Sequence, residues 1–234
     1  MQELNIEGFR VFCQNREEVF TLRREIFSAH CYYFETESPS PVILDIGAHI
    51  GLATLYFKKL YPTAHITAVE PHPTSFSLLK KNCFENMLTD VTLHNSAVVD
   101  DTEKHPTLLL HTDTKDQWLS TTGVVIDAWN GEQETKELVV PTCTLASLIT
   151  GPVDLLKMDI EGAEQKVMLA AGSKLQLVQQ VLIEFHPHVG QDIKKLAHFL
   201  ELAGFDLSYT QDGKEQDLEA VNPRRLILIT GTRE

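Results

Sequence analysis

Short apolar runs alternate with amphipathic stretches along much of the chain. A run at 42–44 is followed by apolar positions at helical spacing over 52–60, and a second, largely apolar strand at 65–70 is followed by another such stretch over 73–87. Unbroken apolar runs are typical of strands buried on both faces of a parallel sheet, and a spacing of three and four indicates a helix with one buried face. The pattern therefore predicts an α/β fold in which strands and helices alternate.

The alternation continues in the second half of the chain. Further strands are predicted at 91–99, 153–160, 181–186, 205–210 and 225–230, and a further helix at 192–203. Residues 100–153 break the pattern, because they are rich in Thr, Asp, Glu and Lys with only three short β-like runs, at 107–111, 123–126 and 138–144. This composition predicts a structured insertion with hairpins. Before the first core strand, an amphipathic helix is expected over 16–27, and its charged residues are expected to form a solvated face.

The 234 residues suffice for one sizeable core. We expect a single domain, 1–234, made of an N-terminal cap (1–41), a ligand-binding half of the sheet (42–99), the insertion (100–153) and a C-terminal half of the sheet (154–234). No apolar stretch approaches the roughly 20 residues that span a bilayer, and the N-terminus lacks the features of a signal peptide. A cytoplasmic protein without a membrane partner is therefore expected.

Charge and cysteine content exclude some function classes. The formal net charge of −13 leaves no general basic field on the surface, which argues against a nucleic-acid partner. The four cysteines are scattered, without a C-x-x-C pair or a neighbouring histidine at zinc spacing, so free thiols in a reducing compartment are expected.

A glycine turn follows the first core strand, in the sequence Asp45-Ile-Gly47-Ala-His49-Ile-Gly51. Ligands of open α/β sheets bind at the carboxyl ends of strands, where glycine lets the backbone approach them. The dinucleotide fingerprint G-x-G-x-x-G fails here, because His49 and Leu52 stand at its second and third glycine positions. Glu70 ends the next strand and suits a ribose diol, since an ionised carboxylate only accepts hydrogen bonds. The turn therefore predicts a nucleoside ligand that need not carry a phosphate.

Residues 44–51 resemble the first motif of class I S-adenosylmethionine-dependent methyltransferases, and Glu70 resembles their second. The segment Asp-Leu-Leu-Lys-Met-Asp-Ile-Glu-Gly-Ala-Glu at 154–164, together with 69–71 and 140–148, is similar to the FkbM family. The resemblance extends over roughly 42–186. It implies a Rossmann-like seven-stranded methyltransferase sheet, mostly parallel with an antiparallel last strand and with helices on both faces.

The resemblance also implies S-adenosylmethionine as cofactor and S-adenosylhomocysteine as product. The cofactor-binding residues expected from it are Asp45, Gly47, His49, Gly51, Glu70, Pro71, Ser96, Ala97 and Asp159. Asp159 and Glu161 would lie near the methionine moiety, whose sulfonium and ammonium a carboxylate attracts, unless they only pair with Lys157. His186 ends the next strand and has an ordinary pKa near 6.5. We expect His186 and Glu161 to be catalytic, with His186 taking the proton of an attacking hydroxyl or else only capping the next helix.

The acceptor is expected to be a small molecule, bound by the cap and the insertion. Tyr33 or its neighbour Tyr32, together with Trp118 and Ser120, are candidates to line its pocket, although packing or a surface position is the favoured explanation for each of them. O-methylation of a small metabolite, sugar or natural product is the expected reaction. N- or carboxyl-methylation, a non-catalytic S-adenosylmethionine-binding module and a nicotinamide-dependent oxidoreductase are alternatives. No metal is expected, although Asp159, Glu161, Glu184 and His186 could supply ligands, and the protein is expected to be a monomer or homodimer.

Overall fold

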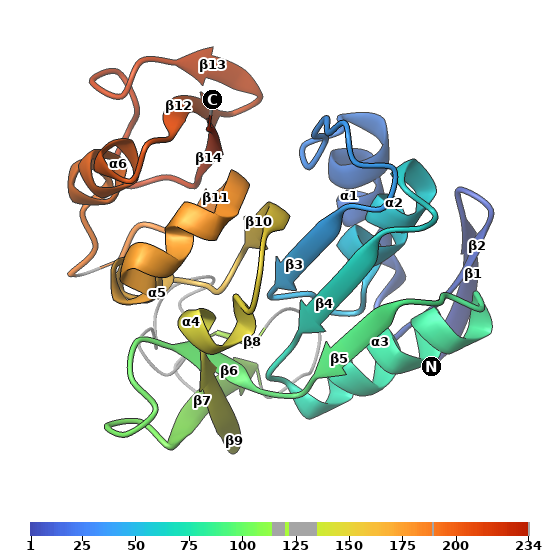
Figure 1. The fold of residues 1–234 in the computed structure, drawn as a ribbon. Coiled ribbons are helices and arrows are strands. Elements are labelled where there is room, and N and C mark those ends of the chain that lie inside the picture. Colours follow the sequence, from blue (N-terminus) through green and yellow to red (C-terminus); the bar gives the residue numbers. More distant parts are fainter. Residues whose placement is uncertain (114–119, 122–134, 189, 234) are drawn as a thin grey trace.

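The computed structural model describes residues 1–113, 120–121, 135–188 and 190–233, without side chains over 112–136. A central eight-stranded sheet has the order β13-β12-β14-β11-β10-β3-β4-β5 (Figure 1). Its strands are β3 (Val42–Ile46), β4 (His65–Val69), β5 (Val91–His94), β10 (Val153–Met158), β11 (Val178–Phe185), β12 (Asp206–Gln211), β13 (Lys214–Gln216) and β14 (Ile227–Thr232). The five strands from β11 to β5 in this order are parallel, and β14 is antiparallel to both of its neighbours.

The predicted α/β sheet, mostly parallel with an antiparallel last strand, is confirmed. The count of seven strands is one short, because β13 pairs with β12 through the turn at Asp212 and Gly213 and adds an eighth strand at the edge. The predicted single strand over 91–99 is wrong. It divides into β5 and β6 (Ala97–Val99), and β6 leaves the central sheet to pair with β9 (Thr135–Thr144).

Helices cover both faces of the central sheet, as predicted. They are α1 (Arg16–Arg23), α2 (Leu52–Leu60), α3 (Pro73–Glu85), α4 (Leu145–Leu148), α5 (Glu164–Ala171) and α6 (Ile193–Leu202). Successive side chains of a strand point to opposite faces, so Ile43 packs in the core with α2 and α3, whereas Leu44 packs in the core with α5 and α6. Within the described residues, no helix combines the length and the apolar character that crossing a bilayer requires.

The N-terminal segment packs on the α2 and α3 side of the sheet. Its hairpin, β1 (Gln2–Ile6) and β2 (Phe9–Cys13), is held by Asn82 of α3, which accepts a hydrogen bond from the Phe12 N–H at 2.7 Å. The helix predicted over 16–27 consists of α1 and a following π-helical turn, η1 (Arg24–Ser28). The sequence predicts that the charged residues of this helix are exposed to solvent. This prediction is wrong for Glu18, because the Glu18 side chain is buried.

A smaller sheet, in the order β6-β9-β7-β8, lies next to the carboxyl ends of the central strands (Figure 1). It consists of β6 and β9 with β7 (Thr107–Asp113) and β8 (Ser120–Thr121). β7 and β9 form an antiparallel pair that coincides with two of the β-like runs noted in the sequence. The third run, at 123–126, lies outside the described residues. The chain enters this sheet at Asn95, whose side-chain amide donates to the carbonyl groups of Glu70 and Pro71.

Candidate functional site

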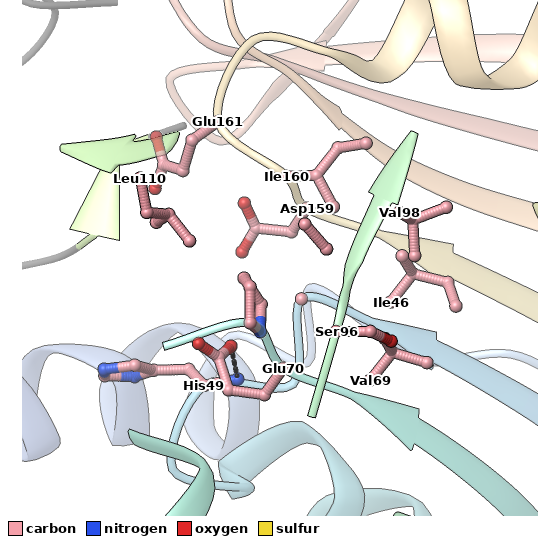
Figure 2. A pocket seen from close by; sticks show the side chains of 13 residues that line it. Ile46, His49, Val69, Glu70, Ser96, Val98, Leu110, Asp159, Ile160 and Glu161 are labelled. Atoms are coloured by element: carbon pink, nitrogen blue, oxygen red, sulfur yellow. Dashed lines mark hydrogen bonds between the residues drawn. The ribbon is translucent and has the colours of Figure 1, made fainter. Parts of the chain in front are cut away.

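A pocket with about 580 Å³ of empty space, open solvent included, lies where the carboxyl ends of β3, β4 and β10 meet the small sheet (Figure 2). It is lined by Ile46, Gly47, His49, Val69, Glu70, Pro71, Ser96, Ala97, Val98, Leu110, Asp159, Ile160 and Glu161. Seven of the nine residues that the sequence suggested for cofactor binding are among them. Asp45 and Gly51 do not line the pocket, and the contacts of each show a structural role in the turn beneath it.

Gly47 and Gly51 shape the turn that forms the floor of the pocket. Gly47 has φ +80°, and a Cβ there would lie 1.7 Å from the backbone oxygen of Asp159. Gly51 has φ +94°, and its Cβ would meet the Leu79 side chain at 2.7 Å. Both positions therefore require glycine for left-handed backbone and for close packing. Gly51 is the N-cap of α2 and does not line the pocket.

Glu70 projects from the end of β4 into the pocket and is anchored by backbone groups. One carboxylate oxygen accepts the His49 N–H at 2.8 Å, and the other accepts the His72 N–H at 2.8 Å. Burial raises the pKa of Glu70 to about 7, although these two hydrogen bonds act in the opposite direction. Each oxygen keeps a further lone pair, so the carboxylate can still accept two hydrogen bonds from a diol.

The base of the site holds a buried ion pair. The Lys157 ammonium donates to the Gly47 carbonyl at 2.7 Å and lies 3.4 Å from Asp45 and 3.8 Å from Asp159. Burial opposes the charge of Lys157, but the neighbouring carboxylates of Asp45 and Asp159 raise its pKa overall. Asp45 also accepts the Thr54 hydroxyl at 2.6 Å. The lysine thus ties β10 to the glycine turn, and Asp45 supports the turn from beneath the pocket.

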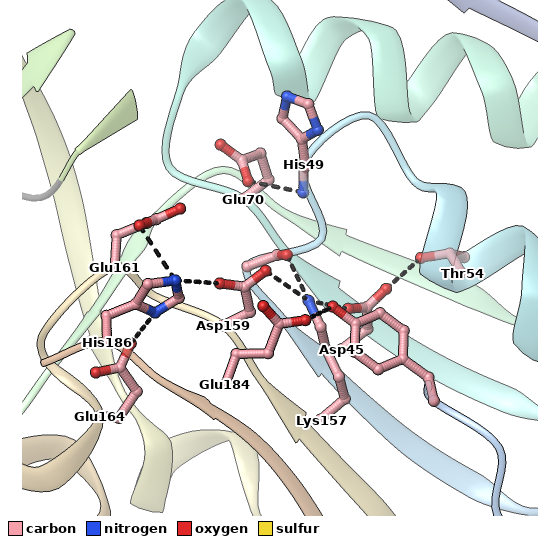
Figure 3. Close-up of polar contacts among 12 residues, drawn as sticks. Asp45, His49, Thr54, Glu70, Lys157, Asp159, Glu161, Glu164, Glu184 and His186 are labelled. Atoms are coloured by element: carbon pink, nitrogen blue, oxygen red, sulfur yellow. Dashed lines mark hydrogen bonds and ion pairs between the residues drawn. The ribbon is translucent and has the colours of Figure 1, made fainter. Parts of the chain in front are cut away.

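His186 lies among three carboxylates at the opposite end of the pocket from Glu70 (Figure 3). Its Nδ1 is 3.1 Å from Glu164, and its Nε2 is 3.4 Å from Glu161 and 3.9 Å from Asp159. Burial would lower the pKa of His186, but the hydrogen bond with Glu164 and the charges of Glu161 and Asp159 raise it to about 10. The imidazole is therefore protonated at neutral pH. In this state it donates protons, so the role of base that the sequence suggested requires a lower pKa of His186.

Glu184 of β11 completes the charged end of the site. Its carboxylate accepts the hydroxyl of Tyr32, which the N-terminal segment contributes from 152 positions earlier in the chain. Burial raises the pKa of Glu184, and the charge of Asp159 adds to this effect. Asp159, Glu184 and His186 offer ligand atoms within 4.8 Å of one another, which is close enough for a cation. A protonated His186 opposes such use, because imidazole binds metals only in its neutral form.

The three residues suggested for the acceptor pocket have different outcomes. Tyr33 is half exposed, and its hydroxyl donates to the neighbouring Glu35 at 2.7 Å, whereas it is Tyr32 that points into the site. Ser120 lies in β8, and Trp118 lies outside the described residues. Sequence reasoning missed the apolar lining from Val98, Leu110 and Ile160, because nothing in an isolated apolar residue distinguishes a pocket wall from a core position.

The arrangement combines a pocket at the carboxyl ends of the strands, a carboxylate that two backbone N–H groups anchor, and a group of negative charges at the far end. These features, on a parallel sheet with an antiparallel last strand, define the protein as a class I methyltransferase. The family model described as "Methyltransferase FkbM domain" matches residues 45–207. The chain therefore belongs to the FkbM methyltransferase family.

Named relatives agree with this assignment. The chain is similar to "Methyltransferase 1" of Beauveria bassiana, with 28% identity over 80% of this chain and 81% of that protein. It is also similar to "31-O-demethyl-FK506 methyltransferase FkbM" of Streptomyces tacrolimicus, with 25% identity over 88% of each chain. The protein is thus a methyltransferase enzyme by family.

Solved structures share the fold at low sequence identity. A methyltransferase FkbM from Methylobacillus flagellatus matches with a TM-score of 0.55 and 13% identity, over 85% of this chain and 45% of that chain. The M. jannaschii protein TYW2 in complex with AdoMet matches with a TM-score of 0.50 and 14% identity, over 99% of this chain and 84% of that chain. An AdoMet-type cofactor is consistent with the fold and the family.

Proposed function

We propose that this protein transfers the methyl group of S-adenosylmethionine to a hydroxyl group of a small metabolite, sugar or natural product. The observation that carries the proposal is the pocket itself, which runs from the anchored carboxylate of Glu70 to the carboxylates of Asp159 and Glu161. The Glu70 end suits a neutral nucleoside, and the end with Asp159 and Glu161 suits a cation. S-adenosylmethionine has this arrangement, because its nucleoside is joined to a positively charged sulfonium.

The residues present fit such a cofactor at each part. The apolar side chains of Val69, Val98 and Ile160 can pack against the adenine ring. The Glu70 carboxylate has free lone pairs that can accept hydrogen bonds from the ribose hydroxyls. Asp159 Oδ1 is buried and, among the described residues, has no hydrogen-bond partner. A buried carboxylate oxygen in that state is stabilised when a positive charge binds beside it.

The bound cofactor supplies a methyl group on a positively charged sulfur, and the chain must orient an acceptor and remove its proton. Asp159 and Glu161 would then face a second cation, so their attraction for the His186 proton would weaken and the pKa of His186 would fall from about 10. His186 then becomes able to accept a proton only when the cofactor is bound. General bases of this kind contribute about 10²- to 10⁴-fold to rates.

The hydroxyl acceptor is supported by a base candidate and by one relative. A hydroxyl must lose its proton during methyl transfer, and His186 lies beside the proposed methyl position through its contacts with Asp159 and Glu161. The Streptomyces tacrolimicus relative is named as a methyltransferase of 31-O-demethyl-FK506, a substrate described as lacking an O-methyl group. N- or carboxyl-methylation remains the alternative reaction, since a carboxylate acceptor needs no base.

Calorimetric titration tests the cofactor first. S-adenosylmethionine and S-adenosylhomocysteine are expected to bind with micromolar dissociation constants, and NAD is expected not to bind. Absence of binding by both would overturn the proposal. Release of S-adenosylhomocysteine in a panel of hydroxylated acceptors then measures turnover.

Glu161→Gln distinguishes an enzyme from a binding module. Glu161 contacts His186 at the charged end of the pocket, where Asp159 also faces the cation, so the variant should still bind the cofactor, more weakly, and lose turnover about 100-fold at saturating cofactor. Turnover unchanged by the substitution would exclude the catalytic role of this carboxylate.

A further inference from the structure

The two nitrogen atoms of the His186 ring have different surroundings (Figure 3). Nε2 faces the carboxylates of Glu161 and Asp159, at 3.4 and 3.9 Å, and both of these residues line the pocket. Nδ1 is 3.1 Å from Oε1 of Glu164, a residue that is fully buried and does not line the pocket. One nitrogen is therefore directed towards the pocket and the other towards the protein interior.

The Glu164 carboxylate is fixed through both of its oxygen atoms. Oε1 accepts the backbone N–H of Gly162 at 3.0 Å, in addition to its contact with His186. Oε2 accepts the side-chain amide of Gln191 at 3.1 Å, and the same amide group donates to the backbone carbonyl of His186 at 2.7 Å. Glu164 is also the first residue of α5, where the free N–H groups of a helix favour a negative charge. These contacts hold the carboxylate and the imidazole in one relative position.

The charge of Glu164 decides which atom carries the proton in this contact. Burial opposes the charge, but the hydrogen bond with His186, the charge of His186 and the Gly162 N–H lower the pKa of Glu164 overall. An ionised carboxylate can only accept hydrogen bonds, so the proton between the two residues is on Nδ1 of His186. This holds whether the ring is charged or neutral.

We propose that Glu164 is a positioning residue for methyl transfer, which keeps a proton on Nδ1 of His186 so that Nε2 is the atom that takes the proton of the acceptor. The assignment rests on the proposed function and deepens it. The acceptor oxygen gains the methyl group and gives its proton to Nε2, and the electron pair of the broken S–C bond stays on the sulfur. With the opposite arrangement, a proton on Nε2 and a lone pair on Nδ1, the basic nitrogen would face the buried Glu164 instead of the pocket.

Nuclear magnetic resonance tests the position of the proton in the unmodified protein. The histidine ring nitrogens are labelled with ¹⁵N, S-adenosylmethionine is added without an acceptor, and His186→Gln identifies the signals of His186. As the pH is raised, the ring should lose its proton from Nε2 and keep the proton on Nδ1. Loss of the proton from Nδ1 would overturn the assignment.

Two substitutions of Glu164 test the effect on turnover at saturating S-adenosylmethionine. Glu164→Leu removes the acceptor beside Nδ1, so kcat should fall about 100-fold, the scale of a lost general base. The KM for S-adenosylmethionine should stay within about threefold, because Glu164 does not line the pocket.

Glu164→Gln is the conservative variant that should rescue turnover. The Gly162 N–H is a fixed donor, so the oxygen of the new amide should lie at the position of Oε1 and still accept the proton of Nδ1. We expect kcat within about tenfold of the unmodified protein. Equal losses in the two variants would mean that the charge acts and not the position of the proton, and an unchanged kcat in Glu164→Leu would exclude any positioning role. Either result overturns the assignment.

Gln165→Leu controls for the loss of a buried hydrogen bond as such. Gln165 is the buried neighbour of Glu164 on α5, and its Oε1 accepts the Asp192 N–H at 2.5 Å, in the same segment that follows β11. This variant should keep kcat within about threefold even where the protein becomes less stable. A loss as large as that of Glu164→Leu would assign the effect to packing and overturn the assignment. If the unmodified protein transfers no methyl group, the proposed function fails, and the resonance spectrum still shows which nitrogen of His186 keeps its proton.

Discussion

The two ends of the pocket are built in different ways. At the nucleoside end, Glu70 is fixed by two backbone N–H groups from turns that follow β3 and β4. At the charged end, His186, Asp159 and Glu161 hold one another mainly through their charges, and they come from two strands and the turn between β10 and α5. Backbone geometry therefore sets the first end, and a balance of charges sets the second.

This difference predicts how each end responds to change. Backbone hydrogen bonds and glycines in the left-handed conformation restrict movement of the backbone. The nucleoside end should therefore keep its shape whether or not a ligand is bound. The charges on His186 and its carboxylates depend on what binds beside them. We expect the nucleoside end to be sensitive to added atoms and the charged end to be sensitive to pH and to ligand charge.

The largest effect is expected for Gly47→Ala. The new Cβ would lie 1.7 Å from the Asp159 backbone oxygen at a φ of +80°, so β3 and β10 must separate at the pocket. We expect a loss of about 3 kcal/mol or more in the free energy of unfolding, measured by chemical denaturation. The control is Gly213→Ala, at φ +71° with nothing within 4 Å, which should lose only about 1 kcal/mol. Equal losses in the two variants would mean that backbone strain alone, without the contact, explains the glycine.

A smaller effect is expected at the charged end, from His186→Gln. The pKa of His186 is about 10 in the folded protein and about 6.5 when unfolded, so its contribution to stability is complete below pH 6.5 and disappears as the pH rises through 10. At pH 6 we expect the free energy of unfolding of the unmodified protein to be about 2 kcal/mol larger than that of the variant. This difference in free energy should decrease steadily towards pH 10 in denaturation experiments.

His198→Gln controls for the loss of a histidine as such. His198 is exposed on α6, so its substitution should leave stability unchanged within about 0.5 kcal/mol across the same pH range. A gap for His186→Gln that is constant with pH would contradict the idea that charges hold this end together.

The fold was predictable where the pattern is local and buried. The helix expected over 52–60 has those bounds in the structure, because its apolar spacing and the Tyr61-Pro62 stop act within the segment. The break between β5 and β6 was not predictable from 91–99. There the chain turns because the Asn95 amide donates to carbonyl groups of Glu70 and Pro71, a tertiary contact that β-favouring residues conceal.

The site, like the fold, was predictable where local sequence patterns determine it and not where tertiary contacts do. Spacing alone pointed to Gly47 and Glu70, since both belong to turns that follow predicted strands. It could not separate Asp45, which supports the turn from below, from residues that face the pocket. Nor could it show that Glu18 is buried beside His49, because a glutamate among charged neighbours on an amphipathic helix has the pattern of a solvated residue. Only the packing of α1 against the glycine turn shows that it is buried.

The smallest effect concerns the proton on Glu70, and it separates the two ends of the pocket in one experiment. Burial sets the pKa of Glu70 at about 7, and ribose hydroxyls donate to its ionised form, so binding should release about half a proton at pH 7 and almost none at pH 9. The ligand of choice is 5′-methylthioadenosine, because it has no ammonium or sulfonium to affect Asp159 or His186. Binding enthalpies in buffers of different ionisation enthalpy measure the release. Glu70→Gln should abolish it and weaken binding by about 1 kcal/mol, since the amide keeps one acceptor oxygen. Release that persists in this variant would mean that the nucleoside end also depends on charge, and that the two ends are not built as differently as their geometry indicates.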